Sequence, residues 1–109
     1  MPNVSAEQTI RDMVRQIAIR FRPEQVILVG SYAKGTAGPD SDVDLLVIMR
    51  PEGSKRQQAT KIDIALKDAP LPKDVIVVTP EDVERQRNII GTVIYPALRE
   101  GKVMYERAA

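Results

Sequence analysis

The stretch that decides the fold is GSYAKGTAGPDSDVDLLV, residues 30–47. It follows Gln25–Val29, a short and almost wholly apolar run with β-branched members, which predicts a buried strand ending at Gly30. Its last residues open Asp42–Met49, a second run that is apolar apart from two aspartates and predicts another buried strand. The stretch therefore joins two strands, and its polar residues lie where one ends and the next begins.

Helical patterns flank these two strands. Ser5–Phe21 carries apolar residues at helical spacing on one face, and Ser5 with Gln8 fits a capping box. We expect a short helix within Tyr32–Ala37 and a longer one after Ser54, where another capping box is expected. The segment between residues 5 and 69 is thus predicted to alternate helix and strand.

The rest of the chain continues this alternation. We expect a strand at Asp74–Val78, a helix that begins at Thr79, and a partly helical stretch over Ile89–Glu100 with Gly101 as its C-cap. A short final strand is expected at Lys102–Tyr105. The pattern predicts an α/β (α+β) fold in two or three layers, with a small mixed β-sheet flanked by helices. We expect residues 1–109 to form a single domain, because 109 residues and 12.1 kDa suffice for one core.

Composition excludes several classes of protein. The 43% hydrophobic and 28% charged residues are typical of a globular domain. The longest apolar run is the five residues Leu45–Met49, whereas a membrane span needs about 20. The N-terminus has no basic region followed by an apolar stretch, so we expect no secretory signal, no membrane partner and a cytoplasmic location.

The residues that are absent narrow the chemistry. With 0 Cys and 0 His, thiolate metal sites, Cys nucleophiles and Ser-His-Asp hydrolysis are excluded. Any metal must then be held by oxygen, which favours Mg²⁺, Mn²⁺ or Ca²⁺. A net charge of +1 and only 4% aromatic residues argue against a nucleic-acid partner.

Asp42 and Asp44 are the first candidate site residues. Residues two apart in a strand point to the same face, with α-carbons about 6–7 Å apart. Two carboxylates placed together repel, and a divalent cation bound between them removes the conflict. The alternative is that Asp42 belongs to a solvated turn and Asp44 is an incidental charge.

Gly30 and Ser31 are the second candidate. They follow a strand where a helix is expected to begin, and free amides at such a point attract phosphate, which glycine lets approach closely. The alternative is an ordinary tight turn. The chain has neither GxxxxGK[ST] nor GxGxxG, which excludes a P-loop and a dinucleotide-binding fingerprint.

Together, Gly-Ser, ten residues and Asp-x-Asp resemble the motif of the nucleotidyltransferase superfamily related to DNA polymerase β. The resemblance extends to Gly35, Thr36, Ser41 and the strand at Leu45–Val47. In length and in its tail, Glu100–Glu106, the chain is similar to the minimal nucleotidyltransferases, the antitoxin half of HEPN–MNT gene pairs. The resemblance covers nearly the whole chain and implies the polymerase β-like fold.

It also implies site residues. Asp42 and Asp44 would hold Mg²⁺, with two ions expected, and Gly30 and Ser31 would hold the phosphates of ATP. The family's third carboxylate falls on Asp74, as a bridging metal ligand or as the base.

One departure and one further candidate accompany these roles. Lys73 stands where the family has an apolar residue, and Asp63, Asp68, Glu81 and Asp82 are weaker rivals of Asp74. Lys34 could reach the triphosphate or could be a solvated loop lysine. Tyr32 is expected to pack under the loop.

The resemblance further implies a function. Larger relatives carry a helical domain for the acceptor, so here a partner would supply it. The family's partner is a HEPN toxin, and the reaction is AMP transfer from ATP to its tyrosine within a hetero-oligomer. One alternative is a non-catalytic antitoxin that covers its partner with Ile89, Ile90, Val93, Ile94 and Tyr95. Another is a transferase acting on a small molecule.

Overall fold

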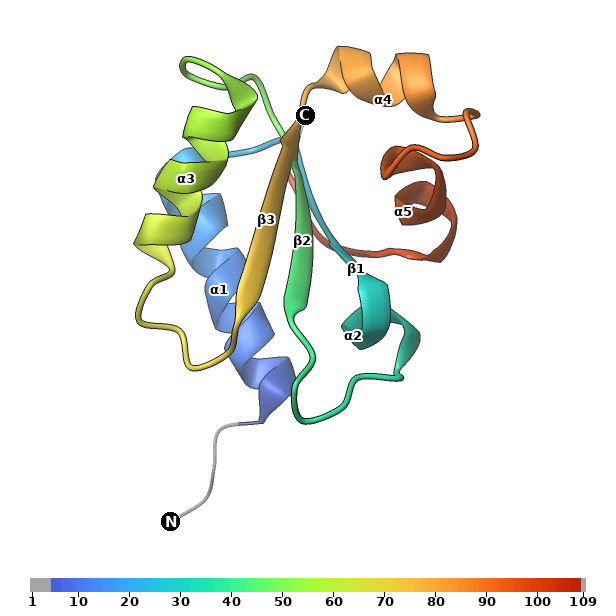
Figure 1. Ribbon diagram of the computed structural model, residues 1–109. Coiled ribbons are helices and arrows are strands. Elements are labelled where there is room, and N and C mark those ends of the chain that lie inside the picture. The colour runs from blue at the N-terminus through green and yellow to red at the C-terminus, as the bar shows by residue number, and fades with distance from the viewer. Residues whose placement is uncertain (1–4, 109) are drawn as a thin grey trace.

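A four-stranded mixed sheet is the centre of the computed structural model, which describes residues 5–108 (Figure 1). The strand order is β3-β2-β1-β4. The bounds are Gln25–Val29 for β1, Val43–Ile48 for β2, Lys73–Val78 for β3 and Lys102–Glu106 for β4. β1 runs antiparallel to β2 and β4, whereas β2 and β3 are parallel. The expected small mixed sheet is confirmed.

Within residues 5–108, five helices accompany the sheet: α1 Ala6–Phe21, α2 Gly30–Lys34, α3 Lys55–Ala65, α4 Pro80–Gln86 and α5 Ile94–Glu100. In Figure 1, α1 and α3 cover one face of the sheet, and α4 and α5 lie on the other side. The short α2 stands at the end of the sheet where β1 stops. The molecule therefore has three layers. None of the helices within residues 5–108 has the length and apolarity that a membrane crossing requires.

The two cores follow from the alternation of side chains along β2. Val43, Leu45 and Val47 belong to the cluster that packs against α1 and α3. Leu46 and Ile48 belong to the cluster on the opposite face, together with Ile94 and Ala97 of α5. Because side chains alternate along a strand, Asp44 shares the α5 face with Leu46.

Helix starts follow the expected caps with one difference. Ser5 accepts a hydrogen bond from the Gln8 N–H at 3.1 Å, but the Gln8 side chain donates to Asp12 at 2.9 Å instead of returning to the cap. The first capping box is therefore only half made. The boxes that begin α3 and α4 are complete, formed by Ser54 with Gln57 and by Thr79 with Asp82.

Several element bounds differ from expectation. The helix expected within Tyr32–Ala37 lies at Gly30–Lys34, and the strand expected from Asp42 begins at Val43, whose N–H donates to the Pro72 carbonyl at 2.8 Å. The stretch expected from Ile89 forms turns first and becomes helical at Ile94. The start of β2 is thus set by a long-range hydrogen bond, whereas α2 ends locally at Gly35, whose N–H donates to the Ser31 carbonyl.

Gly101 is the C-cap of α5, as expected, but its backbone is extended, with φ −75° and ψ 164°. Glycine is needed there for space. A Cβ at this position would lie 2.3 Å from the Ala97 carbonyl oxygen and 2.6 Å from Cγ2 of Ile27. The turn from α5 into β4 therefore brings the backbone directly against β1.

Candidate active site

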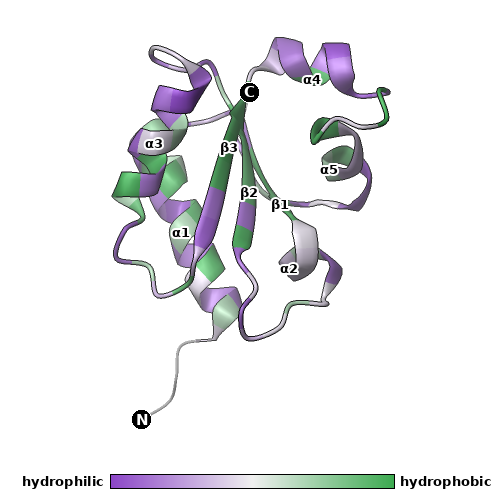
Figure 2. Ribbon diagram, in the orientation of Figure 1, coloured by the Kyte–Doolittle hydropathy of each residue, from purple (hydrophilic) through white to green (hydrophobic). Residues whose placement is uncertain are grey.

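The centre of the candidate site is a pair of aspartates on neighbouring strands. Asp44 of β2 and Asp74 of β3 are register partners in the parallel pair. Adjacent strands lie about 4.8 Å apart, and both residues occupy the α5 face of the sheet. Figure 2 shows the corresponding hydrophilic break in both strands, at the end of the sheet that holds α2. Sequence alone suggested Asp74 only through the family resemblance.

Gly30 packs directly against this pair. Its φ is +73°, a conformation that favours glycine, and a Cβ there would lie 2.4 Å from Oδ2 of Asp44. The contact follows from the antiparallel pairing of β1 with β2, which sets Val29 opposite Asp44. Any side chain at position 30 would therefore displace the Asp44 carboxylate.

A pocket of about 350 Å³ opens at this point. Its polar wall contains Asp44 and Asp74, and Gly30, Lys34 and Glu100 also line it. Apolar residues from β1, β3 and the segment 93–101 complete the lining. A larger hollow of about 720 Å³ lies between α1 and the C-terminal end of α3, on the other face of the sheet and away from both strand aspartates.

The electrostatics of the pocket favour a cation. Partial burial raises the pKa of Asp44 above its usual range, and the negative charges of Asp74 and then Asp42 raise it further. None of the ion pairs found within residues 5–108 involves these three carboxylates. A positive charge bound between them would remove the repulsion.

The donor set fits a magnesium ion that is shared with a substrate. Within the part of the chain that the structure describes, no three His, Cys, Asp or Glu side chains form a metal cluster by themselves. Mg²⁺ needs fewer protein ligands than three, because it usually takes one or two protein carboxylates and completes its shell with water and phosphate oxygens. Asp44 and Asp74 supply that number of carboxylates, all of them oxygen donors.

The other residues singled out in the sequence lie around this centre. Asp42 is exposed, one residue before β2, and lies outside the pocket wall, although its charge acts on Asp44. Ser31 is half-buried in the first turn of α2. Tyr32 packs against the core cluster on the α1 face, as expected.

Lys34 is about half exposed and ends α2 rather than lying in a loop. Its Nζ lies 3.2 Å from Oε2 of Glu100, and both residues line the pocket. No motif or spacing in the sequence pointed to a role for Glu100. Its only signal was its place at the head of the tail that resembles the minimal nucleotidyltransferases.

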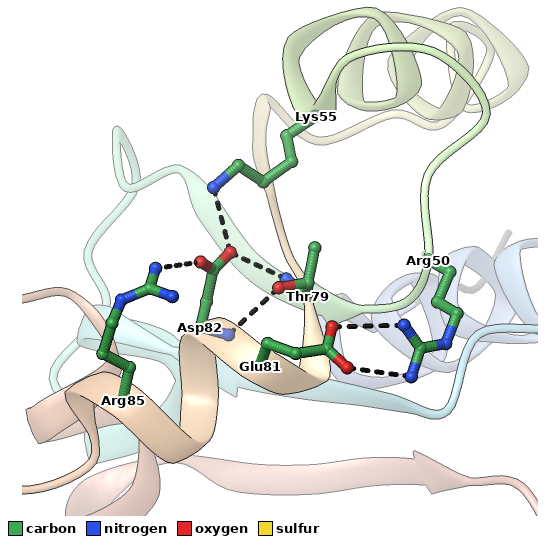
Figure 3. Close-up of polar contacts among 6 residues, drawn as sticks. All are labelled: Arg50, Lys55, Thr79, Glu81, Asp82 and Arg85. Atoms are coloured by element: carbon green, nitrogen blue, oxygen red, sulfur yellow. Dashed lines mark hydrogen bonds and ion pairs between the residues drawn. The ribbon is translucent and has the colours of Figure 1, made fainter.

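Two of the rival carboxylates belong to a different network (Figure 3). Asp82 accepts hydrogen bonds from the Thr79 N–H at 2.9 Å, Lys55 Nζ at 2.9 Å and Arg85 Nη2 at 2.6 Å. Glu81 forms a two-bond ion pair with Arg50. This network lies where β3 ends, whereas Asp74 lies where β3 begins, so it holds α4 in place rather than lining the pocket.

Residues 8–97 match the model of the nucleotidyltransferase domain family. A segment of 51 residues is 31% identical to the bifunctional uridylyltransferase/uridylyl-removing enzyme of Idiomarina loihiensis. That segment is 47% of this chain and 6% of that enzyme, so the chain corresponds to a small part of the curated relative.

Three solved structures share the fold. A candidate nucleotidyltransferase from Sulfolobus solfataricus has a TM-score of 0.63 and 18% identity, over 92% of this chain and 79% of its own. A toxin–antitoxin complex with AMP-PNP has a TM-score of 0.54 and 20% identity, over 94% and 75%. A toxin–antitoxin MntA–HpeT mutant with two Asp-to-Glu changes has a TM-score of 0.53 and 15% identity, over 88% and 71%. At these identities the likeness concerns the fold, and the expected polymerase β-like fold is confirmed.

Proposed function

The chain belongs to the nucleotidyltransferase domain family, and on this premise we propose that it is a Mg²⁺-dependent protein adenylyltransferase. It transfers AMP from ATP to a tyrosine of a HEPN-family toxin and so acts as its antitoxin. The observation that carries the proposal is the register pairing of Asp44 with Asp74 in one pocket with Gly30. Paired carboxylates without a counterion, beside a glycine that leaves space for a phosphate, are suited to binding a nucleoside triphosphate with its cation.

The chain's residues have distinct roles in this proposal. Asp44 and Asp74 hold the metal, with Asp42 as an additional ligand, and Gly30, Ser31 and Lys34 receive the phosphates. Bound Mg²⁺, with two ions expected, would neutralise charge on the triphosphate and lower the pKa of the acceptor hydroxyl. Asp74 would serve as a bridging metal ligand or as the base that takes the hydroxyl proton, and the hydroxyl oxygen would attack the α-phosphorus as pyrophosphate leaves.

The acceptor protein would dock beside the pocket. Ile89 and Ile90 are 49% and 79% exposed, and Val93, at 39%, also lines the pocket. Ile94, which the sequence placed in the same surface, is fully buried at 0% and belongs to the core instead. The shared fold of toxin–antitoxin complexes, one of them with AMP-PNP, supports a toxin and an adenine nucleotide as partners.

A labelling experiment tests the proposal. The protein is incubated with a candidate HEPN-family toxin, Mg²⁺ and each of the four nucleoside triphosphates labelled at the α-phosphate. We expect ATP to label the toxin, and we expect the label to vanish with EDTA or in Asp44→Asn. UTP is the second nucleotide to compare, because of the similarity to a uridylyltransferase. If no nucleotide labels the toxin and Asp44→Asn still neutralises it, the non-catalytic antitoxin is the correct reading.

A further inference from the structure

An ion pair spans the pocket between two elements that are far apart in the sequence. Lys34 is the last residue of α2 and Glu100 is the last residue of α5, and their charged atoms are 3.2 Å apart. Both side chains are about half exposed, at 55% and 57%, and both line the pocket that contains Asp44 and Asp74. The pair thus lies near the pocket's entrance rather than in the core.

The backbone fixes the starting point of each side chain. Gly35 follows Lys34 in a left-handed conformation and ends α2. On the other side, the Gly101 N–H donates to the Ala97 carbonyl at 3.0 Å and ends α5 directly after Glu100. Glu100 is therefore presented to the pocket from the end of a hydrogen-bonded helix.

The choice of partner by Lys34 is the informative observation. A lysine ammonium is a compact charge with three donors on a flexible stem, so it can pair with any carboxylate within its reach. The same pocket contains Asp44 and Asp74, neither of which belongs to any ion pair within residues 5–108, yet Lys34 is paired with Glu100.

We propose that Glu100 is a positioning residue that holds Lys34 away from Asp44 and Asp74. The aspartates then stay open to a divalent cation, and the ammonium stays beside the path of the nucleotide phosphates. This inference rests on the proposed function, since it assigns Glu100 a role in the same site. An exposed ion pair contributes little to stability. If the Lys34–Glu100 pair had only a structural role, breaking it would leave cation binding unchanged.

A double-mutant cycle on cation binding tests the role. Mn²⁺ is titrated by electron paramagnetic resonance, without nucleotide, into wild type, Glu100→Gln, Lys34→Met and the double variant. We expect Glu100→Gln to weaken Mn²⁺ binding about 2- to 5-fold, the range that one exposed ion pair allows. In the Lys34→Met background the same change should have almost no effect, because no ammonium is left to compete. Glu84→Gln, which breaks the Arg87–Glu84 pair on the surface, is the matched control and should bind as wild type does.

Each other outcome is decisive. If Glu100→Gln weakens binding equally in both backgrounds, Glu100 acts by its charge alone and the positioning role is wrong. If Glu100→Gln binds Mn²⁺ as wild type does, the positioning role is also wrong while the metal site stands. If wild type itself binds no Mn²⁺, the metal site of the proposed function fails and the positioning role fails with it. Thermal melts of all variants confirm that each one is folded.

Discussion

Asp44 and Asp74 are direct partners across the parallel strands β2 and β3, and neither has a cationic partner among the ion pairs of residues 5–108. Parallel pairing brings their backbones to about 4.8 Å. The fold thereby concentrates negative charge at one end of its sheet, which costs stability in the absence of a cation. Ligand binding can return that stability by mass action.

Replacing Asp44 by asparagine should affect the stability of the metal-free protein and the binding of Mg²⁺–ATP in different ways. Because the pKa of Asp44 is raised in the folded protein, its ionisation opposes folding, so the contribution of Asp44 to the stability of the metal-free protein should fall as the pH rises above about 4. Asp44→Asn should therefore melt at the same temperature as wild type or slightly higher at pH 7, with no gain below about pH 4. Wild type should gain stability from Mg²⁺ and ATP, and the variant should lose most of that gain. Melting curves across pH check both, and a variant that melts far below wild type would show that Asp44 is structural.

The variant Asp42→Asn tests whether the exposed aspartate before β2 belongs to the metal site. Asp42 adds to the raised pKa of Asp44 but lies outside the pocket wall. We expect Asp42→Asn to leave the melting temperature of the metal-free protein unchanged. If Asp42 is a metal ligand, the variant should weaken Mg²⁺–ATP binding as Asp44→Asn does. Calorimetric titration measures this, and wild-type affinity would remove Asp42 from the site.

Gly30 and Gly35 form a matched pair for testing space at the site. Both have positive φ, +73° and +75°, so alanine strains the backbone by a similar amount, about 1–2 kcal/mol. Only at Gly30 would the added Cβ meet another group, Oδ2 of Asp44 at 2.4 Å, whereas nothing lies within 4 Å of it at Gly35. Both variants should lose stability through backbone strain in chemical denaturation, Gly30→Ala at least as much as Gly35→Ala, and only Gly30→Ala should lose Mg²⁺–ATP binding. Equal loss of binding in both would mean that the Gly30–Asp44 contact does not matter.

Asp82 is predicted to be structural. The Thr79 N–H, followed by Lys55, holds the pKa of Asp82 well below its usual range, and Arg85 adds to the effect. A depressed pKa means that this stabilisation is complete above about pH 5 and is lost as the pH falls below about 4. Asp82→Ala should cost about 2 kcal/mol at pH 7, since it removes a capping box and hydrogen bonds to charged groups. The loss should shrink in denaturation measured near pH 3.

The controls for Asp82 are specific. Glu81→Gln weakens the neighbouring pair with Arg50, which lies on the surface, and should destabilise the protein much less. Nucleotide binding by Asp82→Ala should match wild type under conditions where the variant is folded. A loss of binding by the folded variant would place Asp82 among the site residues.

Gly101 should tolerate no side chain. With φ −75°, alanine is unstrained there, so any cost comes from contact with the Ala97 carbonyl and Ile27. We expect Gly101→Ala to destabilise the protein by about 1–3 kcal/mol, the usual cost of overpacking. Gly101→Asn should be at least as harmful, whereas a left-handed cap would accept asparagine. Denaturation of both variants decides between the two explanations.

The elements themselves follow from local sequence. The apolar run of β1 and the caps at Ser54 and Thr79 have purely local causes, since burial pattern and side-chain capping act within a few residues. The site motif is local as well, because Gly30, Ser31, Asp42 and Asp44 lie within 15 residues. Their spacing was sufficient to indicate the nucleotidyltransferase family, which the family match confirmed.

The assembly of the site depends on tertiary structure. Asp74 meets Asp44 because β3 pairs in parallel with β2, and a shift of one residue would turn Asp74 to the other face. Glu100 meets Lys34 because α5 and α2 converge on one end of the sheet, a contact between residues 66 positions apart that no local pattern encodes. The sequence alone determined which residue types and elements are present. Strand register and helix packing, which depend on burying both faces of the sheet at once, decided which of those residues share a pocket.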